Sequence, residues 1–197
     1  MTRVQSPIKF TYRDYRNLPE SERERFELLG GELVMVPAPV PYHQIVSRNL
    51  EQQLWDFVRR RQLGELLAAP CDVVLTEDVV VQPDLFFISK QRTRIIGDEG
   101  VHGAPDLVVE ILSPSTAERD RTFKRTLYAK YGVREYWLVD PDSQTIEVFI
   151  LGARGYRQAG LYEADEKLKS PLLPGLEISL EEVFTTKNLR RQSEQGR

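Results

Sequence analysis

Apolar residues recur at three- or four-residue intervals along residues 42–62, and the stripe consists of Val46, Leu50, Leu54 and Phe57. This spacing predicts a helix that buries one face, and Gly64 follows closely enough to end it. His43 lies on the same stripe, one turn before Val46, so we expect its imidazole to face inward.

Strands are predicted where apolar residues form short runs bounded by turn residues. The first pair is a hairpin at residues 25–36, with Gly30 and Gly31 as its turn. The run LVVEIL, residues 107–112, is apolar on both faces, which is typical of a central strand covered on both sides. The other predicted strands span residues 72–76, 79–88, 135–140, 145–151, 156–162 and 176–178.

A second helix is predicted over residues 115–131. The capping-box pattern Ser115-x-x-Glu118 opens it, and Gly132 is placed to end it. Together with the strands on either side, this helix forms a right-handed crossover whose two strands are parallel. The order of elements predicts the α/β class, with a mixed central sheet flanked by helices and additional β-hairpins.

Length and composition suit a globular protein. The 197 residues, 41% hydrophobic and 29% charged, fit a single domain, which we place at residues 1–184, followed by a polar tail at 185–197. The net charge of -3 gives no overall basic field, so contact with nucleic acid would need a local basic groove. Cys71 is the only cysteine, which excludes a disulfide within the chain. Without a signal-peptide pattern or an apolar run of about 18 residues, we expect a cytoplasmic protein.

Two acidic residues stand out among the predicted strands. Glu110 lies inside LVVEIL, where a carboxylate is costly unless it is paired or binds a metal, so a buried salt bridge is the alternative to a metal site. Asp84 follows a proline at the start of LFFI, where ordinary turn chemistry is the alternative. Asp106 also follows a proline, but it is about 13 Å from Glu110 along one strand, too far to share an ion. Asp84, on a neighbouring strand, is the better partner.

Two charged residues lie in the middle of the predicted inward face of the second helix. That face is defined by Phe123, Leu127 and Tyr131. A rotation of about 100° per residue places Asp120 and Lys124 among them. A surface ion pair four residues apart is the ordinary alternative. A pair that faces the sheet needs a polar destination instead, and Glu110 on the preceding strand can supply it.

Two carboxylates and one amine are the minimum set for metal-dependent phosphodiester hydrolysis. Asp84 and Glu110 offer the hard oxygen ligands that Mg²⁺ prefers, and Mn²⁺ can substitute. Such a metal lowers the pKa of a bound water and stabilises the charge that grows on the phosphate. Lys124 can position that water or neutralise the developing charge.

Further residues are candidates for supporting roles. Asp120 accompanies Lys124 on the inward helix face. Glu27 and Glu32 flank the hairpin turn and are either additional metal ligands or solvated acids. His43 either contacts a phosphate or a water, or is a histidine at the edge of the core. Tyr128 either borders the site or packs.

The chain resembles the Uma family of restriction endonucleases, which have the PD-(D/E)xK nuclease fold. The matching segments are FELLGGELV, the early His43, QPDLFFI, PDLVVEILSPST, the Asp120-x-x-x-Lys124 spacing and YGVREYWLVDP. They lie roughly within residues 20–150, and the run from VVEILSPS to YWLVDP is long and specific.

The resemblance implies a restriction-endonuclease-like fold, Mg²⁺ dependence and DNA as the substrate. By motif, Asp84 corresponds to the first acid and Glu110 to the second. Leu112 stands where the wider superfamily has its lysine, and Lys124 looks like the replacement from the following helix.

Three functions compete at this point. The first is a Mg²⁺-dependent deoxyribonuclease, expected to act as a homodimer because nucleases of this class commonly cut both strands. The second is a DNA-binding protein with a decayed site, motivated by Leu112 and the negative net charge. The third is a non-catalytic partner-binding domain whose buried acids form a structural network.

Overall fold

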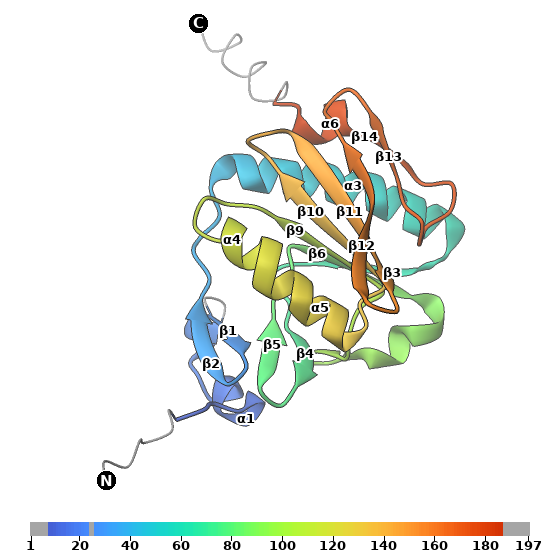
Figure 1. Ribbon diagram of the computed structural model, residues 1–197. Helices are drawn as coiled ribbons and strands as arrows, with labels where there is room; N and C mark the ends of the chain where they lie inside the picture. Colours follow the sequence, from blue (N-terminus) through green and yellow to red (C-terminus); the bar gives the residue numbers. More distant parts are fainter. Residues whose placement is uncertain (1–7, 24–25, 187–197) are drawn as a thin grey trace, which may run out of the picture.

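Two six-stranded β-sheets form the framework of the computed structural model, which describes residues 8–23 and 26–186 (Figure 1). Sheet A contains, in spatial order, β2 (Glu32–Met35), β1 (Phe26–Leu29), β5 (Val79–Val81), β4 (Val73–Thr76), β8 (Gly100–His102) and β7 (Ile96–Gly97). Sheet B contains β12 (Gly155–Tyr162), β11 (Thr145–Gly152), β10 (Glu135–Asp140), β9 (Leu107–Ile111), β6 (Leu85–Ser89) and β3 (Gly64–Ala68). β13 (Lys167–Lys169) pairs separately with β14 (Glu177–Ser179).

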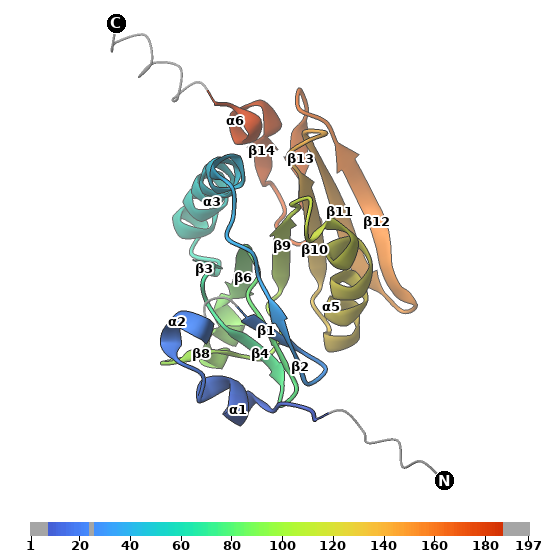
Figure 2. The same ribbon diagram turned by 90° about the vertical axis from the view of Figure 1, so that its left-hand side faces the viewer.

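Helices cover both faces of sheet B (Figure 2). One face carries α3 (Pro41–Arg61), which confirms the first predicted helix. The helix buries Val46, Leu50 and Leu54 of the predicted stripe, whereas Phe57 is only partly buried. The other carries α4 (Ala117–Arg119), a π-helical turn (Asp120–Lys124) and α5 (Arg125–Tyr131). The shorter helices are α1 (Tyr12–Arg16), α2 (Glu20–Arg23), a 3-10 helix (Lys90–Ile95) and α6 (Leu180–Phe184). No helix in the described ranges is long and apolar enough to cross a membrane.

Strand β9 lies at the centre of the hydrophobic core. It pairs in parallel with β10 and antiparallel with β6. Val109 packs on the side of α3, whereas Val108 packs on the side of α5, so both faces of the strand are covered. This arrangement confirms the predicted central strand, the parallel crossover and the α/β class with a mixed sheet flanked by helices.

Two local predictions are wrong. The single strand predicted at 79–88 is divided, because Gln82, Pro83 and Asp84 carry the chain from β5 in sheet A to β6 in sheet B. A proline removes a ladder hydrogen bond, which explains why pairing stops there. The predicted capping box at Ser115 is also absent, since the helix begins at Ala117 and the Ser115 hydroxyl lies 3.1 Å from that of Ser113.

The π-helical turn changes which side chains face the sheet. Phe123, predicted to point inward, is 45% exposed, whereas Asp120 and Lys124 are 2% and 4% exposed. A π turn contains more residues than an α turn, so a regular rotation per residue does not hold through it. Asp120 and Lys124 face the sheet as predicted, and only the aromatic ring of Phe123 departs from the prediction by lying at the surface.

The two ends of the chain lie outside the described residues. This applies to residues 1–7 and to residues 187–197, which make up most of the predicted polar tail at 185–197.

We predict that Gly64→Ala destabilises the protein far more than Gly132→Ala. A Cβ at Gly64 would overlap the carbonyl oxygen of Ile88 on β6, and the backbone there has φ +151°. At Gly132, φ is +85°, and an added Cβ would meet no atom within 4 Å apart from its chain neighbours. Only backbone strain of about 1–2 kcal/mol therefore applies. Urea denaturation should give a loss of about 3 kcal/mol or more for Gly64→Ala. Equal losses for the two variants would contradict the close approach of β3 to β6.

Candidate active site

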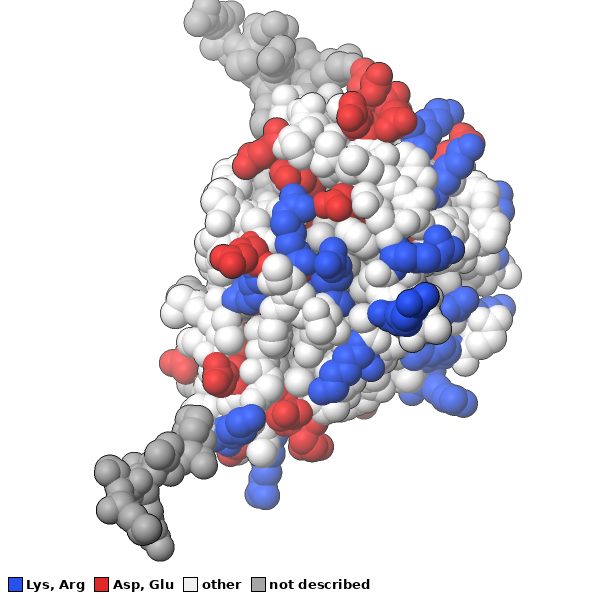
Figure 3. Space-filling model, viewed as in Figure 1, with Lys and Arg blue, Asp and Glu red and all other residues white. Residues whose placement is uncertain are grey.

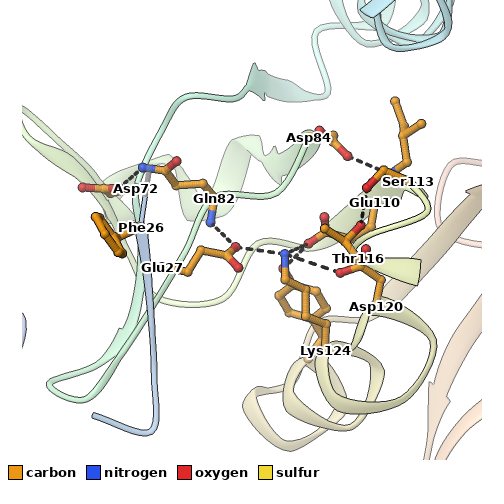
Figure 4. A network of polar contacts seen from close by, with 12 residues as sticks. Phe26, Glu27, Asp72, Gln82, Asp84, Glu110, Ser113, Thr116, Asp120 and Lys124 are labelled. Atoms are coloured by element: carbon orange, nitrogen blue, oxygen red, sulfur yellow. Dashed lines mark hydrogen bonds and ion pairs between the residues drawn. The ribbon is translucent and has the colours of Figure 1, made fainter. Parts of the chain in front are cut away.

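Charged side chains from two sheets and one helix converge on the ammonium of Lys124 (Figure 4). Its Nζ lies 2.9 Å from Glu27 Oε1 on β1 and 3.0 Å from Glu110 Oε1 on β9. Asp120 Oδ1, from the same π turn, lies 3.7 Å away. All four side chains are buried, so this cluster is shielded from solvent.

The strand register brings Asp84 next to Glu110. Leu85 of β6 pairs with Val109 of β9 in antiparallel register, so the position before Leu85 lies opposite the position after Val109. Residues that face one another in an antiparallel pair have side chains on the same side of the sheet. Asp84 Oδ2 is held in place by the backbone N–H of Ile111, which donates to it at 2.7 Å.

His43 reaches the same place from α3. Its Nε2 lies 3.0 Å from the carbonyl oxygen of Ile111 and 3.4 Å from Asp84 Oδ2. Burial lowers the pKa of the imidazole, but the hydrogen bond and charge of Asp84, together with the Ile111 carbonyl, outweigh this, and the pKa of His43 is raised. The inward orientation expected from the sequence is therefore observed.

Tyr128 and Lys124 fix the carboxylate of Glu110. The phenol of Tyr128 donates to Glu110 Oε1 at 2.6 Å, and Lys124 donates to the same oxygen. Both partners lie on the helix that covers β9, one turn apart. Tyr128 therefore both contacts the cluster and packs in the core, so the two roles considered from the sequence occur together.

One ammonium cannot compensate all the carboxylates around it. Burial raises the pKa of Glu110 well above its ordinary value, and the neighbouring carboxylates add to the rise against the opposing effect of Lys124. Burial also raises the pKa of Asp120. Burial by itself lowers the pKa of Lys124, but Glu110 and the other two acids outweigh it and raise the pKa, so the amine stays charged. Burial therefore disfavours the charged forms of Glu110 and Asp120, and the Lys124 ammonium opposes this effect at both acids.

Two buried carboxylate oxygens of the cluster accept no hydrogen bond. Among the described residues these are Glu27 Oε2 and Asp120 Oδ1, and the latter lies 3.7 Å from the Lys124 ammonium. The other oxygen of Glu27 accepts from the backbone N–H of Gln82 at 3.0 Å. Buried oxygens normally find a hydrogen-bond partner, so this cluster has unused acceptor capacity.

Gln82 was not identified from the sequence as part of the site. Its backbone N–H holds Glu27, and its side-chain amide donates to Asp72 Oδ1 at 2.8 Å. It therefore ties the site to sheet A at the point where the chain leaves that sheet. The signal was present in the segment QPDLFFI, in which glutamine stands two residues before Asp84.

Two other acids lie apart from the cluster. Glu32 is exposed on β2, and no contact of its side chain with the cluster is found in the described part of the chain. Asp106 is buried, but it accepts from the backbone N–H of Ser89 at 2.8 Å and pairs with Arg92 at 3.0 Å. Its role is structural, in agreement with its exclusion as a partner of Glu110.

A face rich in basic residues lies outside the helix that carries Lys124. Figure 3 shows Lys and Arg side chains gathered on the side of the molecule where α5 lies. The helical segment itself contributes Arg119, Arg121, Arg125 and Lys130. Arg121 is engaged by Asp140 at 2.8 Å and by Glu147 at 2.6 Å. The net negative charge of the chain thus coexists with a local basic surface.

The cluster is not a closed metal cage. Within the described ranges, no three His, Cys, Asp or Glu side chains are arranged to hold a metal ion. The Lys124 ammonium lies among Glu27, Glu110 and Asp120 instead.

The fold, with its mixed central sheet flanked by helices, is that of a restriction-endonuclease-like protein. The model of the Uma2 family, described as "Putative restriction endonuclease", matches residues 12–181, and the chain belongs to this family. A comparison with solved structures found the crystal structure of a "putative nuclease" of the DUF820 group from Anabaena variabilis, with 22% sequence identity and a TM-score of 0.74. The match covers 89% of this chain and 97% of that one. A comparison with curated proteins found no significant match.

We predict that Lys124→Met destabilises the protein most at neutral and alkaline pH. Removal of the buried ammonium leaves its carboxylate partners unpaired, at a cost of about 3–5 kcal/mol. Without Lys124, the pKa of Glu110 rises further above its unfolded value, so the folded variant takes up protons as the pH falls. The loss should therefore be large at about pH 8 and smaller towards pH 5, above the usual carboxyl range of about 4.

The measurement is urea denaturation at several pH values. Lys130→Met is the matched control, because Lys130 is exposed on the same helix and its loss should change stability little at any pH. A loss for Lys124→Met that does not depend on pH would argue against the shared ammonium.

Proposed function

We propose that this protein is a Mg²⁺-dependent endonuclease that hydrolyses phosphodiester bonds of DNA. The observation that carries the proposal is the convergence of Asp84, Glu110 and Lys124, with an ammonium 3.0 Å from the Glu110 carboxylate. Membership of the Uma2 family supports a nuclease.

The donor atoms suit a hard divalent cation. Asp84 and Glu110 are the residues that would hold it, and both offer carboxylate oxygens, which Mg²⁺ prefers and Mn²⁺ also accepts. Several carboxylates around a single ammonium fit the addition of a cation. When bound, such an ion supplies an acidified water and stabilises charge on the phosphate.

The chain's own groups prepare this chemistry. Lys124 keeps its proton, so it acts as a fixed positive charge that attracts the phosphate and offsets the negative charge of the transition state. Glu27 and Glu110 hold that charge in position at 2.9 and 3.0 Å. Tyr128 fixes Glu110, and the Ile111 N–H fixes Asp84, so neither carboxylate has to reorganise on binding.

The position of Leu112 bears on whether the site is active. A decayed site was one alternative, because the wider superfamily has a lysine at this position. Leu112 is buried in the hydrophobic cluster on the α5 side of sheet B, and Lys124 approaches Glu110 from the covering helix instead. A lysine from the helix can do the same chemistry, because geometry rather than chain position defines a site. This observation favours the enzyme over the decayed nuclease.

DNA is the proposed substrate for two reasons. The family is described as restriction endonucleases. The basic face over α5 offers Lys and Arg side chains for phosphate contacts, and such contacts do not need a positive net charge of the whole chain.

We predict that the protein cleaves DNA with Mg²⁺ or Mn²⁺ and not with EDTA. Asp84→Asn, Glu110→Gln and Lys124→Met should each lower the rate by at least about a hundredfold, because each removes a group that acts on the reacting phosphate or its ion. Gel assays on linear and supercoiled DNA measure the rate. Glu32→Gln is the matched control, since Glu32 is an exposed acid outside the cluster and should leave cleavage unchanged.

Two outcomes would contradict the proposal. Salt-dependent DNA binding without cleavage at any concentration of either metal would indicate a DNA-binding protein with a decayed site. Neither binding nor cleavage would indicate a non-catalytic domain whose buried acids are structural.

A further inference from the structure

We propose that Arg119 binds a backbone phosphate of the DNA strand that lies at the catalytic cluster. The inference rests on the proposed function and deepens it, because it selects one residue of the basic face as a contact to the substrate. Arg119 ends α4 and immediately precedes Asp120 in the chain.

The other three basic residues of this helical segment have partners within the fold. One forms ion pairs with two carboxylates, and two lie over aromatic rings: Arg121 with Asp140 and Glu147, Arg125 over Phe149, and Lys130 over Tyr131. The fold therefore already uses these three cations.

Arg119 has no such partner. Within the described ranges, its guanidinium forms no ion pair or hydrogen bond, and its Nε is buried without an acceptor. The two Nη nitrogens are not among the buried atoms that lack a partner, so they reach solvent. An N–H group without an acceptor is costly in a protein, and a bound anion would supply the acceptors that the fold does not.

The position of Arg119 brings its charge to the catalytic cluster. Thr116 and Asp120, on either side of it in the chain, lie beside Lys124 (Figure 4). Burial raises the pKa of Asp120, whereas Lys124 and, more weakly, Arg119 lower it, so the charge of Arg119 acts on a member of the cluster. Lys130 lies about 16 Å further along the helix.

Arg119 and Lys124 have different surroundings, which suit different tasks. Lys124 is 4% exposed and lies among carboxylates, so it cannot reach a strand that crosses the surface. Arg119 is half-buried, and its planar guanidinium can donate two parallel hydrogen bonds to one phosphate. Arg119 therefore positions the strand while Lys124 acts from below.

The test measures binding of the full chain to a fluorescent duplex of about 30 base pairs by anisotropy, in EDTA and at several NaCl concentrations. Each phosphate contact contributes about 0.9 to the slope of log K against log salt concentration. Arg119→Gln should lower the slope by about that amount and weaken binding at low salt by about tenfold. Loss of a purely structural contact would not change the slope.

Two variants serve as controls. Arg119→Lys keeps the charge but not the paired donors, so it should keep the slope and lose only part of the affinity. Arg60→Gln makes the same change in net charge on α3, on the opposite face of sheet B, where Arg60 is exposed and lies 3.2 Å from Asp56. It should leave the slope unchanged. Urea denaturation should show wild-type stability for Arg119→Gln, because Arg119 has no internal partner to lose.

The outcomes distinguish this inference from the proposed function. A slope that Arg119→Gln leaves unchanged, or that Arg60→Gln lowers equally, overturns the role of Arg119. The proposed nuclease then stands if the wild type cleaves DNA with Mg²⁺. A wild type that neither binds nor cleaves DNA overturns both.

Discussion

The architecture of the site depends on one buried ammonium shared by carboxylates from different parts of the fold. Lys124 is the charge that allows Glu27 of sheet A and Glu110 of sheet B to lie in the same interior. Neither acid is compatible with a dry core unless it is neutralised or paired. The pairing joins the two sheets through electrostatics as well as through apolar packing, so the integrity of the site and the contact between the sheets are coupled.

The crossing of the chain between the sheets serves the same site. Three consecutive residues have different roles in this crossing. The backbone N–H of Gln82 donates to Glu27, and Pro83 ends the strand pairing. Asp84 then lies beside Glu110 on the neighbouring strand. This short connection between the two sheets therefore supplies both an N–H group that binds one carboxylate and a second carboxylate. Loops and strand ends placed on a rigid scaffold are common positions for functional groups.

Much of this could be predicted from the sequence, and the failures have physical causes. The sequence showed two departures from the usual pattern of apolar core positions: an acid inside LVVEIL and a charged pair on an apolar helix face. Such departures are expected at functional sites. Glu27 was only one of two hairpin acids in the sequence, because nothing local distinguishes it from the exposed Glu32; its burial depends on the helix that folds over the hairpin. β3 was missed because its sequence, GELLA, lacks the β-branched and aromatic residues typical of strands.

The π-helical turn at Asp120–Lys124 separates two requirements that a regular helix would link. Along a straight α-helix, residues that pack and residues that react share one periodicity, so moving either group disturbs the other. Through this turn Leu127 and Tyr128 keep their places in the core while Lys124 contacts a carboxylate on the sheet. A helix can in this way supply a buried amine to the sheet without rebuilding the hydrophobic interior.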